Sequence, residues 1–160
     1  MKLITPKYIS VGFLIGFAAV ALYLSSVDYR YFLLQREVKA WSFRYPPTEM
    51  ELERVERSLS EISQSFNPNI LWLEAIVLEW RAYNDGENGR FFLKRSEGKL
   101  EQALNLREVD SRLWAHLAVI QTKLGMPKST VNESVENAKR YGAKDVATWK
   151  LLDYMQELRQ

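Results

Sequence analysis

The feature that most constrains this chain is an uncharged, apolar run near its N-terminus. Residues 8–27 are 20 consecutive residues without a charged side chain, mostly Ile, Val, Phe, Leu, Ala and Gly. A helix rises about 1.5 Å per residue, so this run would span about 30 Å, the thickness of the hydrocarbon core of a bilayer. The run predicts a single transmembrane helix, preceded by a short basic N-terminus over residues 1–7.

A cleaved signal peptide is the alternative interpretation, because Lys2 and Lys7 form a basic region ahead of the apolar run. Cleavage requires small residues at −3 and −1, and the nearest candidate places Leu24 at −3 and Ser26 at −1. The sequence therefore favours an uncleaved anchor. Basic residues flank both ends of the run, but its preceding segment is short, so we expect that segment in the cytoplasm. The rest of the chain would then lie in the periplasm, on a bacterial inner membrane.

Two glycines give the apolar run a spacing that is used for pairing helices. Gly12 and Gly16 form a G-x-x-x-G pattern, in which small residues let two apolar helices approach closely. They are candidate residues for joining two copies of the chain into a homo-oligomer. Because the spacing is common in apolar helices, an unpaired helix is the alternative.

An aromatic and basic segment, residues 28–47, follows the apolar run. Its Arg and Lys residues alternate with Tyr29, Tyr31, Phe32, Trp41, Phe43 and Tyr45. Such rings prefer the headgroup layer, where basic side chains meet anionic lipid, which indicates a juxtamembrane helix on or rising from the bilayer. The equal alternative is a linker whose aromatic side chains pack under the following domain. Pro46 and Pro47 forbid a continuing helix and place the domain boundary.

Charge and cysteine content narrow the function classes. Up to Tyr45 there are six basic and two acidic residues, a net of +4, so the remainder of a chain with net charge +2 carries −2. A slightly acidic domain lacks the positive field that phosphate backbones require, so nucleic acid is not an expected partner. With no cysteine, the chain has no disulfide framework, no thiolate nucleophile and no cysteine-based zinc site.

Beyond the prolines, capping residues and apolar periodicity predict six helices. Thr48 and Glu51 form a capping box, Asn67 precedes Pro68 as an N-cap, and Gly142 stands where a left-handed residue closes a helix. The expected helices cover residues 48–64, 70–83, 91–106, 110–124, 127–142, and 145 nearly to the C-terminus. The predicted fold class is all-α, with an N-terminal transmembrane helix followed by stacked helical hairpins over residues 48–160.

Tryptophan and alanine recur in this domain at matched offsets. Trp114 and Trp149 are 35 residues apart, and Ala103 and Ala138 each lie eleven residues before one of them. Small residues at the alanine positions allow neighbouring helices to approach closely. This pattern resembles the tetratricopeptide repeat, which has a period of about 34 residues. The resemblance implies a solenoid with an extended concave surface that holds partner proteins.

The resemblance has one clear departure. The spacing from Trp72 to Trp114 is 42 residues, about eight more than one repeat, and the excess fits a polar loop over residues 84–90. We therefore expect a degenerate array of about two and a half repeats that ends in a solvating helix.

The N-terminal half carries a second resemblance. Residues 10–30, with the core Gly12-Phe13-Leu14-Ile15-Gly16 and the exit Ser25-Ser26-Val27-Asp28-Tyr29-Arg30, precede Tyr45-Pro46-Pro47. Together they resemble the VpsP-like proteins that accompany bacterial exopolysaccharide biosynthesis. The resemblance implies a scaffold for membrane proteins of a polysaccharide assembly or export machine. An assembly factor of another envelope complex, for cell division, secretion or cytochrome maturation, is the alternative.

Residues suited to catalysis do not form a recognisable constellation. His116 is the only histidine, and without a cysteine or second histidine we expect a packing or surface role, no metal site and no cofactor. A carboxylate-dependent glycan hydrolase is the least implausible enzyme, drawing on Glu74, Glu79, Asp85 and Glu87. No spacing singles out two of these carboxylates, so we expect a binding protein and not an enzyme.

Aromatic residues beside the polar loop are the best candidates for binding. Trp80 and Tyr83 fit the buried register of the repeat less well than the other tryptophans, and Phe91 and Phe92 follow the loop. Aromatic anchors dominate the energy of many protein interfaces, so we expect these four residues to border a groove for a partner protein. The alternative is that they cover the core of the first hairpin.

Overall fold

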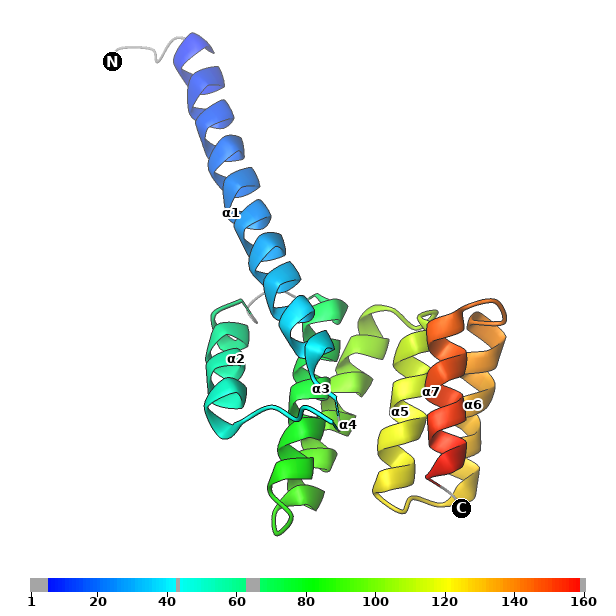
Figure 1. The fold of residues 1–160 in the computed structure, drawn as a ribbon. Helices are drawn as coiled ribbons and strands as arrows, with labels where there is room; N and C mark the ends of the chain where they lie inside the picture. Colours follow the sequence, from blue (N-terminus) through cyan, green and yellow to red (C-terminus); the bar gives the residue numbers. More distant parts are fainter. Residues whose placement is uncertain (1–5, 43, 63–66, 159–160) are drawn as a thin grey trace.

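The computed structural model describes residues 6–42, 44–62 and 67–158, with side chains from residue 14 onward. Within these residues the fold is all-α, as expected, with no strand and a single isolated β-bridge between Ser42 and Tyr45 (Figure 1). The helices are α1 (Pro6–Ala40), α2 (Glu49–Ile62), α3 (Pro68–Asn84), α4 (Gly89–Leu106), α5 (Ser111–Lys123), α6 (Lys128–Tyr141) and α7 (Val146–Glu157).

Helix α1 joins the predicted membrane run to the aromatic segment without a break. Its N-terminal part projects from the domain, and its C-terminal part lies against α2 and α3 (Figure 1). Among the residues whose side chains the structure describes, no helix is long and apolar enough to cross a membrane. Residues 8–13 of the predicted span, which include Gly12, lie outside that description, and Gly16 has open space around its Cα.

The aromatic segment after the run divides into two environments. Tyr31 and Trp41 pack against the core formed by α1, α2 and α3, as a linker under the domain would. Tyr29 and Phe32 are exposed on α1. Phe43 lies outside the described residues. Part of the segment therefore packs under the domain, and part of it is left uncovered by the described chain.

Capping explains where most of the helices begin. The Thr48 backbone N–H donates to Glu51 Oε2 at 2.7 Å while the Glu51 N–H donates to Thr48 Oγ1 at 3.3 Å, which is the expected capping box. Asn67 accepts from the N–H of Asn69 at 2.9 Å and starts α3. All six predicted helices of the domain are present, as α2 to α7.

One capping expectation is wrong. Gly142 has a φ of −124° and is not left-handed. Glycine is needed there because a Cβ would lie 2.5 Å from the Ser111 Cβ, where the turn before α7 approaches α5. The left-handed glycine is Gly125, with a φ of +68°. It closes α5 by donating to the Thr122 carbonyl at 3.0 Å, while the next N–H, of Met126, donates to the Gln121 carbonyl at 3.0 Å.

The core consists of three apolar clusters in chain order. The first is formed by α1, α2 and α3, the second by α3, α4 and α5, and the third by α5, α6 and α7. Because α3 and α5 each contribute to two clusters, every unit packs on the next one. The helices accordingly stack in sequence order, with α3 beside α4, α5 beside α6, and α7 against α5 (Figure 1).

The turn between α4 and α5 is repeated 35 residues later between α6 and α7. Trp114 Nε1 donates to the Glu108 carbonyl at 2.6 Å, and Trp149 Nε1 donates to the Ala143 carbonyl at 3.3 Å. Each indole thus binds the carbonyl six residues before it. Trp72 does not share this contact, because its Nε1 donates to His116 Nδ1.

Backbone capping in the two turns follows the same period. Asp110 accepts from the N–H two residues on at 3.1 Å, and Asp145 does so at 3.2 Å. At the preceding helix ends, the Ala103 and Ala138 carbonyls accept the closing N–H at 3.0 and 2.9 Å, and both alanine side chains are fully buried. The 35-residue recurrence in the sequence is therefore a recurrence of local structure.

Candidate partner-binding site

An inner groove lies along the face built from α3, α5 and α7. It encloses about 180 Å³ between α3 and α7, with α5 as its floor. The lining residues are Glu79, Trp80, Tyr83, His116, Val119, Lys123, Leu151 and Tyr154. Two of these helices, α3 and α5, are each followed by a helix that packs against them, and α7 follows α6 as α5 follows α4.

A buried polar network forms the floor of the inner groove. Trp72 Nε1 donates to His116 Nδ1 at 3.1 Å, and an indole N–H can only donate, so Nδ1 is the unprotonated ring nitrogen. Nε2 therefore carries the proton and donates to Glu79 Oε2 at 2.8 Å. The other carboxylate oxygen of Glu79 accepts from Lys123 Nζ at 2.6 Å. Both nitrogens of His116 are thus occupied, which fixes the imidazole as a structural link between α3 and α5.

The network keeps its carboxylate ionised. Burial alone would raise the pKa of Glu79, but the hydrogen bonds that it accepts from His116 and Lys123 and the positive charge of Lys123 lower it to about 2. Burial also opposes the charge on Lys123, yet Glu79 raises the pKa of this ammonium above its ordinary value. The floor therefore holds a neutralised pair of opposite charges and offers little net charge to a ligand.

Aromatic rings form the walls of the inner groove. The Trp80 and Tyr83 rings meet edge to face with centroids 5.7 Å apart, and Tyr83 is 56% exposed. On the opposite wall, Lys123 Nζ lies 5.2 Å from the centre of the Tyr154 ring. A groove with aromatic walls and a neutralised floor is suited to burying the side chains of a bound polypeptide segment.

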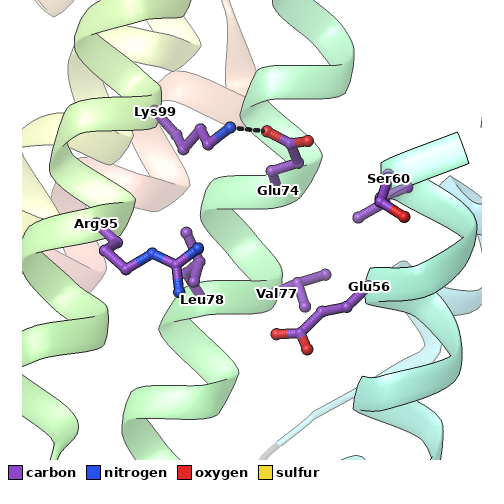
Figure 2. A pocket seen from close by; sticks show the side chains of 8 residues that line it. Glu56, Ser60, Glu74, Val77, Leu78, Arg95 and Lys99 are labelled. Atoms are coloured by element: carbon purple, nitrogen blue, oxygen red, sulfur yellow. Dashed lines mark ion pairs between the residues drawn. The ribbon is translucent and has the colours of Figure 1, made fainter. Parts of the chain in front are cut away.

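A second, outer groove lies between α2 and α4 with α3 as its floor. It encloses about 400 Å³ and is lined by Glu56, Leu59, Ser60, Glu74, Val77, Leu78, Arg95 and Lys99 (Figure 2). Lys99 Nζ pairs with Glu74 Oε2 at 2.6 Å across α3 and α4. The Arg95 side chain extends toward Leu78, and its guanidinium lies 5.7 Å from the centre of the Phe91 ring.

The structure does not bring the four predicted aromatic residues into one site. Trp80 and Tyr83 line the inner groove, and Trp80 also packs on the first core cluster, as the alternative expectation had it. Phe91 belongs instead with Arg95 beside the outer groove, and Phe92 meets Phe91 edge to face at 5.5 Å. The two pairs separate because Trp80 and Tyr83 lie on the side of α3 that borders the inner groove, whereas Phe91 lies on α4, which borders the outer groove.

The sequence predicted a packing or surface role for His116, which the structure buries in this network, but it did not single out Lys123. They are two helical turns apart on α5, so their spacing of seven residues places both on the face that meets α3. That spacing was the available signal. Pairing them with Glu79 required the packing of α3 on α5, which the sequence does not specify.

The carboxylates considered for a glycan hydrolase lie apart. Glu74 pairs with Lys99 in the outer groove, Glu79 pairs with Lys123 in the inner groove, and Asp85 accepts from Asn88 in the α3–α4 turn. Among the described residues, no group of three or more His, Cys, Asp or Glu side chains could hold a metal ion. Glu74 and Glu79 therefore line different grooves, and the carboxylate that shares the outer groove with Glu74 is Glu56.

Comparison with known proteins found no matching protein family, no similar curated protein and no similar solved structure.

Proposed function

We propose that this chain is a membrane-anchored protein-interaction scaffold of the bacterial cell envelope. Residues 8–27 hold it in the inner membrane as a single span, with the helical domain in the periplasm. The domain is a degenerate array of tetratricopeptide-like repeats, and its inner groove binds a segment of a partner protein. The chain takes no cofactor and acts by holding its partner, without catalysis.

The observation that carries this proposal is the repeated turn. The hydrogen bonds of Trp114 and Trp149, and the N-caps at Asp110 and Asp145, recur after 35 residues. Such repetition supports a solenoid, because each unit buries its apolar face on its neighbour and the first helices of successive units share one surface. Extended surfaces of this kind hold peptides and partner domains.

The exposed part of α1 supports the anchor. Its large apolar side chains protrude from the domain without cover from the rest of the described chain, at Leu14, Ile15, Phe17, Val20, Leu22, Tyr23 and Leu24. Exposing an apolar surface of this extent to water is unfavourable, whereas contact with the apolar chains of lipid is not. Together with residues 8–13 it has the length of a span.

The partner we propose is a membrane protein of a polysaccharide assembly or export machine, following the resemblance of residues 10–30 to the VpsP-like proteins. A component of a division, secretion or cytochrome maturation complex is the alternative. The two differ only in the identity of the bound protein, so one capture experiment distinguishes them.

Site-specific photocrosslinking in membranes tests the proposal. A photoreactive amino acid is placed at Tyr83 or Leu151, which line the inner groove. As a control, the photoreactive amino acid is placed at Thr130 or Glu133, on the face formed by α4, α5 and α6. We expect an adduct with one envelope protein from the inner positions, and mass spectrometry identifies its class. Equal adduct yields from the inner-groove positions and from Thr130 and Glu133 would contradict binding in the inner groove.

A further inference from the structure

The outer groove has a counterpart further along the stack. This counterpart, which we call the α4–α6 groove, encloses about 220 Å³ between α4 and α6, with α5 as its floor. The residues that line it are Glu101, Leu104, Asn105, Trp114, Leu117, Gln121, Thr130, Glu133 and Ser134. The outer groove lies in the same way between α2 and α4 on α3, so the two grooves can be compared position by position.

One wall is the same in both grooves and the other wall differs. The shared wall carries a Glu, a Leu three residues later and a small polar residue next to it, as Glu56, Leu59 and Ser60 on α2 and as Glu101, Leu104 and Asn105 on α4. On the other wall, Arg95 and Lys99 of α4 lie 35 residues before Thr130 and Ser134 of α6. The period of the repeat therefore relates two basic residues of the outer groove to two hydroxyl residues of its counterpart.

This difference gives the outer groove positive charges that its counterpart lacks. Each groove is lined by two acidic residues, Glu56 and Glu74 in the outer groove and Glu101 and Glu133 in the α4–α6 groove. The outer groove adds two bases, whereas no lysine or arginine is among the described residues that line the counterpart. An anionic group is therefore attracted more strongly to the outer groove than to the α4–α6 groove.

Ion pairs within the domain occupy both acids of the outer groove. Arg81 donates from Nε and Nη2 to the two carboxylate oxygens of Glu56, at 2.9 and 2.8 Å. Arg81 also binds Glu49, an exposed residue at the start of α2 that does not line the groove. Lys99 Nζ pairs with Glu74 Oε2 at 2.6 Å. Neither lining carboxylate is therefore free to neutralise the remaining base.

Arg95 is that remaining base. It is exposed and forms no ion pair with any residue that the structure describes. Its side chain extends into the groove toward Leu78 (Figure 2), and the Phe91 ring, 5.7 Å from its guanidinium, is itself 59% exposed. A guanidinium presents paired N–H groups that match the two oxygens of a carboxylate. The outer groove thus offers a place for one carboxylate beside an exposed aromatic ring.

We propose that the outer groove binds an acidic segment of a protein, in which an Asp or Glu carboxylate accepts from Arg95 and a neighbouring apolar side chain packs on Phe91. The charge of this segment complements the unpaired base of the lining, whereas the α4–α6 groove, with two acids and no described base, repels it. This inference rests on the proposed role in protein binding. It depends neither on the membrane anchor nor on the segment that the inner groove holds.

Peptide selection tests the site with a defined probe. Random peptides displayed on phage are selected on the full chain in detergent, and the recovered peptides are then measured against the unmodified chain and Arg95→Gln. We expect a class of peptides that binds Arg95→Gln about tenfold or more weakly and is enriched in Asp or Glu over the starting library. Recovery only of peptides that bind both chains equally, or no acidic enrichment in the Arg95-dependent class, would overturn the inference.

An amide version of the selected peptide tests the carboxylate itself. Replacing its acid by Asn or Gln is expected to weaken binding about tenfold in the unmodified chain and to have little further effect in Arg95→Gln. Independent losses from the two changes would mean that the peptide acid does not meet Arg95, and would overturn the proposed contact. Because Arg95 makes no ion pair within the described chain, Arg95→Gln is expected to unfold at the same temperature as the unmodified chain.

Two control variants make the result specific to the outer groove. Arg90→Gln removes an exposed charge from α4 outside the groove lining, and Tyr83→Ala alters the inner groove. Each is expected to change the affinity of the acidic peptide less than about twofold. A tenfold loss from Arg90→Gln would mean that net charge alone attracts the peptide, and the same loss from Tyr83→Ala would place it in the inner groove. Either result would overturn the inference, whereas failed crosslinking from the inner groove with Arg95-dependent binding intact would reject only the inner site.

Discussion

The substitution Glu79→Gln tests whether the buried network between α3 and α5 stabilises the fold. The carboxylate accepts two hydrogen bonds from α5, at 2.8 Å from His116 and at 2.6 Å from Lys123, and both Glu79 and Lys123 side chains are about one-fifth exposed. A hydrogen bond to a charged group contributes about 1.5–3 kcal/mol. Gln retains an acceptor for His116 but removes the charge opposite Lys123, whose residual exposure allows partial solvation. We therefore expect a loss of about 2 kcal/mol in the free energy of unfolding.

The assay is thermal and urea unfolding of the full chain in detergent, followed by circular dichroism. For a chain of this size, a loss of about 2 kcal/mol lowers the Tm by roughly 4–8 °C. Glu136→Gln is the matched control, because Glu136 is exposed and its pair with Lys139 is solvated, so it changes stability by about 0.5 kcal/mol or less. If Glu79→Gln changes stability no more than this control, the network does not join the helices as described.

The pH dependence gives the same prediction a second readout. The pKa of Glu79 falls from 4.5 in the unfolded chain to about 2 in the folded chain. The ionised carboxylate therefore contributes fully to the free energy of unfolding above about pH 4.5, and this contribution is lost as the pH falls toward about 2. The stability difference between the unmodified chain and Glu79→Gln is therefore constant near neutral pH and shrinks between about pH 5 and pH 2. A difference that grows on acidification would contradict the ionised state of Glu79.

Three glycines test the local backbone by the same unfolding assay. Gly142→Ala is expected to cost about 1–3 kcal/mol, because its Cβ would lie 2.5 Å from the Ser111 Cβ and the turn before α7 must move. Gly98→Ala, in the middle of α4 with open space around it, is expected to raise stability by about 0.5–1 kcal/mol through helix propensity, and a loss would mean that α4 is distorted there. Gly125→Ala is expected to cost about 1–2 kcal/mol, because its φ of +68° is strained for a residue with a side chain, and an unchanged Tm would show that this turn relaxes freely.

Local patterns were sufficient to predict the helices. The capping box at Thr48 and the N-cap at Asn67 depend on residues two or three positions apart, so the sequence contains both partners of each bond. The 35-residue recurrence of Trp114 and Trp149 was visible for the same reason, because equivalent turns repeat equivalent residues.

Contacts between helices decided what the sequence could not. Gly142 looked like a left-handed cap, yet it is a glycine because Ser111, 31 residues earlier, occupies the space of a side chain. The aromatic residues beside the polar loop were predicted to form one site, but Tyr83 borders the inner groove, which α3 forms with α5 and α7, and Phe91 lies on α4 beside Arg95 of the outer groove. Which residues of α1 are buried also depends on where α2 and α3 pack against it. The sequence of α1 alone does not contain this information.

The separation of Tyr83 from Phe91 provides the most direct test of the proposed scaffold. Both are aromatic residues with more than half of their surface exposed, but only Tyr83 lines the inner groove. The measurement is the affinity of the full chain for the envelope protein that crosslinks from the inner groove. We expect Tyr83→Ala to weaken binding by about tenfold or more and Phe91→Ala to change it less than about twofold. Equal losses from the two variants, or no loss from Tyr83→Ala, would contradict a partner site in the inner groove.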